Sequence, residues 1–169
     1  MNNQVDQQIS SSLSSRKRKH GIIRARHARL AAVQALYQQT ITAIDPEELI
    51  SEFLAYRLNE EQDSTFSLKA DAQLFTDIVR GFCHHHTEID CMISSVLRPK
   101  IIFKRLELLI QSILRAGTLE LLIHQDLPKP IILDEYITIA KAFFNGRESA
   151  MINGILHAIV HRKDQTESE

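Results

Sequence analysis

The sequence predicts an all-α fold, and three observations carry this prediction. Apolar residues recur at three- and four-residue spacing over most of the chain, which is the period of a helix. Only five Gly and four Pro occur among 169 residues, of which 44% are hydrophobic. No Asn-Gly or Asp-Gly pair separates two alternating apolar runs, as a β-hairpin would require. We therefore expect a single helical domain of about seven helices.

The first predicted helix begins near Arg26 and carries an apolar stripe at helical spacing. Residues 1–20 precede it, are rich in Ser, Gln and Asn, and end in the cluster Arg16-Lys17-Arg18-Lys19. This composition can bury little apolar surface. We therefore expect a mobile basic arm over residues 1–20, a helical domain over 21–163 and a polar tail over 164–169.

The remaining helices follow from capping signals and apolar runs. A second helix starts at Asp45-Pro46-Glu47-Glu48, with Asp45 as N-cap, and runs to about Asn59. Further helices are predicted through 74–82 and 89–96, separated by a cap at Thr87 and ended by Pro99. Residues 103–123 are so apolar that we expect this helix at the core. The Pro-Lys-Pro run at 128–130 predicts an extended crossing, and two helices follow through 133–140 and 152–159.

Charge is distributed unevenly along the chain. The formal net charge is −1, yet no Asp or Glu lies between Asp6 and Asp45. The Lys and Arg residues of that interval are Arg16, Lys17, Arg18, Lys19, Arg24, Arg26 and Arg29. Such a cluster neutralises phosphates and releases their counterions, which favours RNA binding. A solvated tail explains this basic segment equally well. Base stacking adds little support for RNA binding, because Tyr37 is the one nearby aromatic residue and its spacing turns it toward the core.

A zinc site is the other chemistry that the residue types suggest. The run His84-His85-His86 lies between Cys83 and Cys91, and imidazole and thiolate are common zinc ligands. Consecutive helical residues point about 100° apart, so three adjacent His side chains cannot converge on one ion. We expect no metal and interpret the run as an exposed helix end.

The sequence also argues against an enzyme. The adjacent carboxylates Glu47-Glu48 and Asp134-Glu135 diverge on a helix, and we interpret them as helix-start charges. No phosphate-binding Gly loop or nucleophile elbow occurs, so we expect neither catalysis nor a cofactor. Two cysteines in a helical stretch, without a signal peptide or an apolar run long enough to span a membrane, predict a cytoplasmic protein.

Several segments, taken in order, resemble the NusB family of bacterial antitermination factors. They are R-H-A-R-L-A-A-V-Q-A-L-Y-Q over 26–38, L-R-A-G-T-L-E-L over 114–121, D-E-Y-I-T-I-A-K over 134–141 and M-I-N-G-I-L over 151–156. The stretch F-F-N-G-R-E over 143–148 resembles the alphaproteobacterial variant. Met151 and Leu119 depart from the family pattern, in which Phe and Tyr are commoner.

The resemblance implies a fold and a set of partners. The fold is two roughly perpendicular three-helix bundles. The partners are a single-stranded boxA-type RNA in ribosomal RNA leader transcripts, the ribosomal protein NusE, and the RNA polymerase elongation complex with other Nus factors. The sequence leaves open whether the chain is a monomer or a homodimer.

Site residues carry over at the matching positions. Arg26 and Arg29 become expected RNA contacts, followed by Arg24 and the cluster at 16–19. Tyr37 and Met151 match positions at or near the NusE surface or the RNA groove, and a core position fits each equally well. We interpret Asn153-Gly154 as a packing site at which a small residue lets two helices approach.

Two other classes compete with this interpretation. The RNA-binding domain of an rRNA cytosine methyltransferase resembles the same family, but 169 residues leave no room for its cofactor domain. A helical adaptor or homodimer would use the Arg-rich face for protein contacts only. Salt dependence distinguishes RNA binding by this face from protein binding, because the affinity for phosphates falls steeply as the ionic strength rises.

Overall fold

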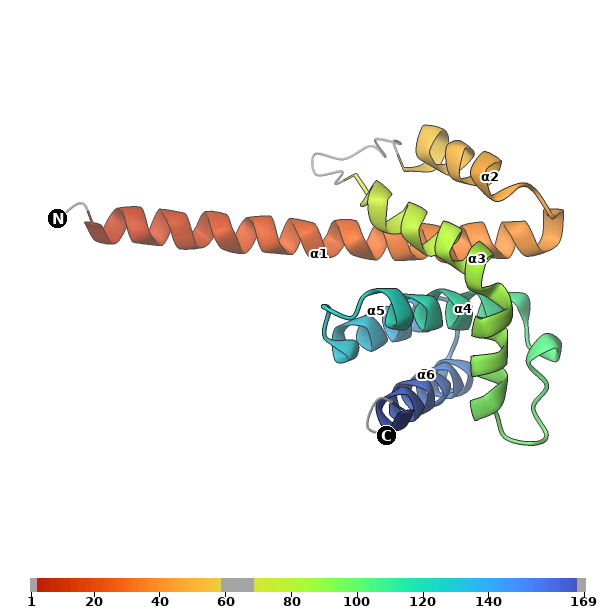
Figure 1. The fold of residues 1–169 in the computed structure, drawn as a ribbon. Coiled ribbons are helices and arrows are strands. Elements are labelled where there is room, and N and C mark those ends of the chain that lie inside the picture. Colours follow the sequence, from red (N-terminus) through yellow and green to blue (C-terminus); the bar gives the residue numbers. More distant parts are fainter. Residues whose placement is uncertain (1–2, 59–68, 167–169) are drawn as a thin grey trace.

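The computed structural model describes residues 3–58 and 69–166, and their side chains over 15–58 and 69–165. No strand occurs in these ranges, so the all-α prediction is confirmed. The elements are α1 (Asn3–Thr42), α2 (Pro46–Glu52), a π turn η1 (Phe53–Arg57), α3 (Ala72–Val96), a 3-10 turn η2 (Phe103–Arg105), α4 (Leu108–Ile123), α5 (Lys129–Phe143) and α6 (Gly146–Thr166) (Figure 1).

The helices form two sets of three. Helices α1, α2 and α3 all contact one another, and so do α4, α5 and α6. The two sets are joined where α1 and α3 pack against α4 and where α3 reaches α6. In Figure 1, α2 lies on one side of α1 and the α4–α6 set lies on the other. Helix α1 is therefore shared by both sides of the molecule.

The core lies around α4, as its composition predicts. Most residues of α4 are buried, because other helices pack around it. Helix α1 contributes Ala28, Ala32, Val33 and Leu36 to the same core. These positions recur at three- and four-residue spacing, so one stripe of α1 is apolar from Ala28 onward.

The number of helices differs from the prediction because two predicted helices are one. Helix α3 runs without a break from Ala72 to Val96, and Thr87 lies inside it instead of capping a new helix. No proline interrupts this stretch before Pro99. The described residues therefore form six α-helices, where about seven were predicted.

Three helix starts test the capping arguments. Asp45 caps α2 as predicted, because its side chain accepts hydrogen bonds from the backbone N–H groups of Glu47 and Glu48. The predicted crossing at Pro128 is shorter than expected, since α5 begins at Lys129 and Pro130 lies in its first turn. First-turn amides have no acceptor within the helix, so proline is tolerated there. Residues 103–107 form η2 and a break before α4 instead of part of that helix.

Helix α1 begins at Asn3, well ahead of the predicted start near Arg26. Its first half projects beyond the rest of the molecule (Figure 1). The segment contains no proline, and Gly21 is its one glycine, so few residues oppose a continuous helix. The mobility of residues 1–20 and the three-part division of the chain stay predictions.

None of the helices in the described part of the chain has the length and apolar character needed to cross a membrane.

Candidate nucleic-acid interface

The basic cluster Arg16-Lys17-Arg18-Lys19 lies on the projecting half of α1, and all four side chains are exposed. Among the ion pairs formed between described residues, none involves these four side chains. Consecutive helical residues point in different directions, so the cluster surrounds the helix with positive charge. This arrangement suits a flexible polyanion that can wrap around the helix.

Arg24 lies where α1 meets the body of the protein. Its Nε atom donates a hydrogen bond to the backbone carbonyl of Lys69, at 3.0 Å. The backbone N–H of Asp71 donates in turn to the carbonyl of Arg24, at 3.1 Å. Asp71 also caps α3 through the N–H of Leu74. These bonds fix α1 to the start of α3, while the Arg24 side chain stays exposed.

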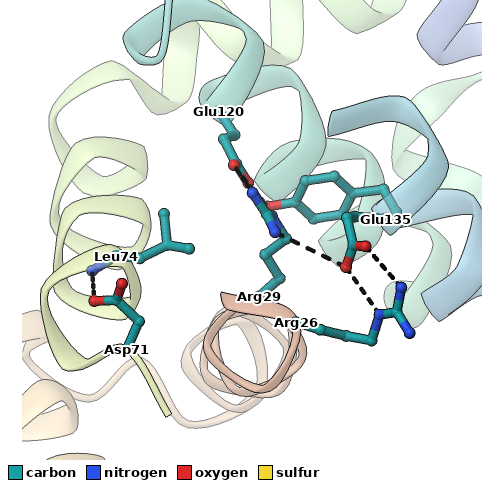
Figure 2. A network of polar contacts seen from close by, with 7 residues as sticks. Arg26, Arg29, Asp71, Leu74, Glu120 and Glu135 are labelled. Carbon is teal, nitrogen blue, oxygen red and sulfur yellow. Dashed lines mark hydrogen bonds and ion pairs between the residues drawn. The ribbon is translucent and has the colours of Figure 1, made fainter. Parts of the chain in front are cut away.

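Arg26 forms a two-point ion pair with Glu135 of α5. Its Nε and Nη2 atoms lie 2.9 and 2.7 Å from the two carboxylate oxygens (Figure 2). The Arg26 side chain is 43% exposed, whereas that of Glu135 is 7% exposed. The hydrogen bond that Arg26 donates to Glu135 raises the pKa of the Arg26 guanidinium. The Arg26 side chain is therefore partly exposed, while its Nε and Nη2 atoms are already bonded to Glu135.

Arg29 lies one turn further along α1 and is buried. Its guanidinium contacts the carboxylate of Glu120 on α4 at 2.5 to 3.1 Å, and the Tyr136 hydroxyl donates to the same carboxylate at 2.9 Å. A longer contact of 3.8 Å joins its Nη1 atom to Glu135 (Figure 2). Burial, followed by the charge of Glu120, raises the pKa of Tyr136 well above its ordinary value. The tyrosine therefore stays neutral and acts as a donor.

These contacts divide the predicted RNA-binding residues by accessibility. Arg16 to Lys19 and Arg24 are exposed, but the side chain of Arg29 is only 5% exposed and its charge is matched by Glu120. In this structure Arg29 is not accessible to an RNA phosphate, in contrast to the expectation from the sequence. Arg29 instead joins α1 to α4, and Arg26 joins α1 to α5.

Glu120 and Glu135 are the residues that the sequence interpretation missed. Glu135 was interpreted as a helix-start charge, but it lies in the second turn of α5 and is buried. Both carboxylates occur in helices whose residues are mostly apolar, where a buried charge requires a partner. That conflict between residue type and surroundings is the signal that could have pointed to buried ion pairs.

Tyr37 lies at the surface, not in the core toward which its spacing pointed. It is 38% exposed and lines a groove of about 490 Å³. The groove runs between the end of α1, Leu109 at the start of α4 and Phe143 at the end of α5. Ile41 and Phe143 expose apolar surface beside Tyr37. The groove thus combines aromatic and aliphatic side chains with polar and charged ones, among them Arg57 and Glu107.

Met151 lines a second groove of about 490 Å³, and this groove has positive charge at its rim. Arg98 and Arg147 flank it, and both side chains are exposed. No Asp or Glu lies between Asp90 and Glu107, a second acid-free interval that sequence reasoning did not use. Gly154 also lines this groove and has open space beside it, so the predicted packing role of Gly154 is wrong.

The histidine run offers no metal site. His84, His85 and His86 are exposed as predicted, but they lie in the interior of α3 instead of at a helix end. Within the described ranges, no group of three or more His, Cys, Asp or Glu side chains is arranged to hold a metal ion. Cys83 is half-buried and contacts Gln39, while Cys91 is exposed.

The fold and these surfaces define a class: an all-helical protein with a long basic helix joined to the body by buried ion pairs. The NusB family model matches residues 26–161, and the chain belongs to the NusB family. The transcription antitermination protein NusB of Sinorhizobium fredii (strain NBRC 101917 / NGR234) is 45% identical over 132 residues, covering 78% of this chain and 82% of that protein. The corresponding protein of Agrobacterium fabrum (strain C58 / ATCC 33970) is 42% identical, with 78% and 80% covered. This likeness confirms the predicted alphaproteobacterial variant.

Solved structures agree on the fold. NusB from T. maritima superposes with a TM-score of 0.67 at 31% identity, covering 84% of this chain and 96% of that chain.

Proposed function

We propose that this chain is an RNA-binding transcription antitermination factor. It binds boxA-type single-stranded RNA in ribosomal RNA leader transcripts together with the ribosomal protein NusE, and it supports processive transcription by RNA polymerase with other Nus factors. The observation that carries the proposal is membership in a family whose relatives are antitermination proteins, combined with an exposed acid-free basic segment on α1. It acts in the cytoplasm, where bacterial transcription takes place, and it is not an enzyme.

The basic residues of α1 take two roles in this proposal. Arg16, Lys17, Arg18, Lys19 and Arg24 contact phosphates, because their side chains are exposed and none of them forms an ion pair with another described residue. Arg29 is a positioning residue that orients α1 through Glu120. Phosphate contacts are independent of sequence, so recognition of particular bases comes from another surface.

The two grooves suit different partners. The Tyr37 groove places exposed aromatic and aliphatic side chains beside polar ones, a mixture typical of protein–protein contacts, and we assign it to NusE. The Met151 groove has Arg98 and Arg147 beside apolar side chains, a combination that fits phosphates together with unstacked bases. A solved NusB structure that shares this fold, with a TM-score of 0.66 at 22% identity over 79% of this chain and 93% of that chain, is of antitermination factors NusB and NusE in complex with dsRNA.

The test is a titration of the full chain into a labelled boxA-like RNA, a scrambled RNA and a duplex of the same length. Each titration is run at two salt concentrations, with and without NusE. We expect the boxA-like single strand to bind most tightly, NusE to tighten it further and salt to weaken it. Replacing Arg16, Lys17, Arg18 and Lys19 with Gln should lower the slope of log affinity against log salt by about 3.

The control is Lys141→Gln, which removes an exposed cation from α5 and should leave the slope almost unchanged. Equal, weak binding of all three RNAs with no effect of NusE would contradict the proposal. A helical adaptor that binds a protein through the Tyr37 groove would then be the better interpretation.

A further inference from the structure

Glu135 binds the Arg26 guanidinium in the two-point geometry that a phosphate would adopt. The two carboxylate oxygens accept from Nε and Nη2 of Arg26 in a parallel pair of hydrogen bonds. Arginine uses this same edge for bidentate binding of carboxylates and phosphates. An RNA phosphate that approached this edge would have to displace a carboxylate that is already bound.

The local charges are balanced without an external anion. Arg26 and Arg29 contribute two positive charges, and Glu120 and Glu135 contribute two negative ones (Figure 2). Tyr136 stays neutral because burial and Glu120 raise its pKa. The four charges of the cluster therefore cancel, and among the described residues the positive charge of α1 that lacks an ion-pair partner ends at Arg24.

Displacement of Glu135 is unfavourable because its carboxylate is buried. Without Arg26, its one remaining cationic contact among the described residues is Arg29 at 3.8 Å, and Arg29 is already held by Glu120. A buried carboxylate that loses its partner is strongly destabilised, whereas a phosphate contact at an exposed position gains little. Arg26 therefore stays with Glu135.

We propose that Glu135 sets the inner limit of the RNA-contacting stretch of α1, so that phosphates contact Arg24 but not Arg26. Glu135 is thus a specificity-determining residue that fixes how many phosphates this helix engages. The inference rests on the proposed RNA-binding function and adds to it the position at which the phosphate contacts stop.

The first test compares three single variants and one double variant of the full chain in salt-dependent RNA titrations. Arg24→Ala should weaken binding and lower the salt slope by about 1. Arg26→Ala/Glu135→Gln removes Arg26 without leaving a buried carboxylate unpaired, so it should change neither. Glu135→Gln should tighten binding and raise the slope by about 1, because it frees one arginine. Asp134→Asn is the matched control, since Asp134 is the adjacent exposed carboxylate and its loss leaves the Arg26 pair intact.

Because the double variant keeps the cluster neutral, its affinity and slope should match those of the unaltered chain. Two results would overturn the inference: Arg26→Ala/Glu135→Gln that weakens binding as much as Arg24→Ala, or Glu135→Gln that matches Asp134→Asn. Circular dichroism establishes that each variant is folded. If Glu135→Gln alone does not fold, the comparison of Arg24→Ala with the double variant still decides.

A second test needs no RNA and separates this inference from the proposed function. Phenylglyoxal modifies accessible arginines, and peptide mass spectrometry gives the rate at each site. In the unaltered chain Arg26 should react more slowly than Arg24, and Glu135→Gln should remove most of that difference. Equal rates in the unaltered chain would overturn the inference. Failure of the unaltered chain to bind RNA would instead overturn the proposed function.

Discussion

Glu120 is a carboxylate with no exposed surface, and its partners come from two other helices, α1 and α5. Burying a charge is unfavourable unless hydrogen bonds and an opposite charge replace the lost water. Arg29 supplies the opposite charge and Tyr136 supplies a further donor. The stability of the fold therefore depends on Arg29, although the same residue looks like a ligand contact in the sequence.

Arg29→Ala should lower the free energy of unfolding by about 3–5 kcal/mol, because it leaves Glu120 buried without its cation. Urea unfolding followed by circular dichroism measures this change. Arg80→Ala is the control, since the ion pair between Arg80 and Glu47 is exposed and its loss should have little effect. A stability of Arg29→Ala equal to that of the unaltered chain would contradict the role of Arg29.

Tyr136 makes stability depend on pH in the alkaline range. The unfolded chain releases this proton at a pKa of about 10, whereas burial and Glu120 hold the pKa of the folded state well above that value. The contribution is therefore complete below about pH 10 and is lost as the pH rises further. The difference in free energy of unfolding between the unaltered chain and Tyr136→Phe should narrow from about pH 10 upward.

The control for this pH effect is Tyr56→Phe. Tyr56 is 70% exposed, so its replacement should give a gap that does not change with pH. Parallel pH profiles for both variants would show that Tyr136 does not retain its proton in the folded state.

The charges on α1 could be read from the sequence, but the partners of these charges could not. Glu120 and Glu135 lie 91 and 109 residues away from Arg29 and Arg26, respectively. No local spacing rule connects positions so far apart. Arg26 and Arg29 were therefore predicted to be RNA contacts like the exposed cations. The exposed cluster at 16–19 needed no such partner and was placed correctly at the surface.

Among the elements, α4 shows how closely the helices approach. A Cβ atom on Gly117 would lie 3.2 Å from Leu156 and from the Tyr136 ring. The Tyr136 hydroxyl is bonded to Glu120, so the ring cannot move away without breaking a buried hydrogen bond. Gly117 is therefore required by packing, although glycine disfavours a helix.

Gly117→Ala should destabilise the protein, whereas Gly154→Ala should stabilise it by up to about 1 kcal/mol. No atom lies within 4 Å of a Cβ placed on Gly154, so alanine brings only its higher helix propensity. Thermal unfolding of the two variants checks the opposite signs. Destabilisation by Gly154→Ala would show that this part of α6 packs against something more than solvent.

Helix existence was easier to predict than helix length. The Asp45 cap and the apolar period of α4 are local signals, and both agreed with the structure. The prediction of two helices separated at Thr87 was wrong, because a threonine that could cap a helix can also lie inside one. The late start assigned to α1 failed because polar residues without an apolar stripe carry no helical period, whatever their backbone conformation.

The molecule as a whole is less compact than its length suggests. A compact domain of 169 residues has a radius of gyration of about 15 Å. The half of α1 that precedes the body adds a rod roughly 30 Å long. Small-angle X-ray scattering should therefore give a radius of gyration clearly above 15 Å.

A chain that begins at His20 should bring the radius of gyration back toward that of a compact domain. The circular dichroism difference between the two chains gives the helix content of residues 1–19. A difference without helical character would contradict the N-terminal part of α1 and favour the mobile arm expected from the composition.

Because α1 is one continuous helix, a force on its outer half is carried into its buried half. In mechanical terms α1 is a lever whose fulcrum lies between Arg24, bonded to the start of α3, and Arg29, bonded to α4. A load on the outer arm produces a torque at this fulcrum, and the ion pairs to α4 and α5 resist it. Any load on the outer half of α1 would thus strain the contacts between the two helix sets, at the place where α1 joins α4 and α5.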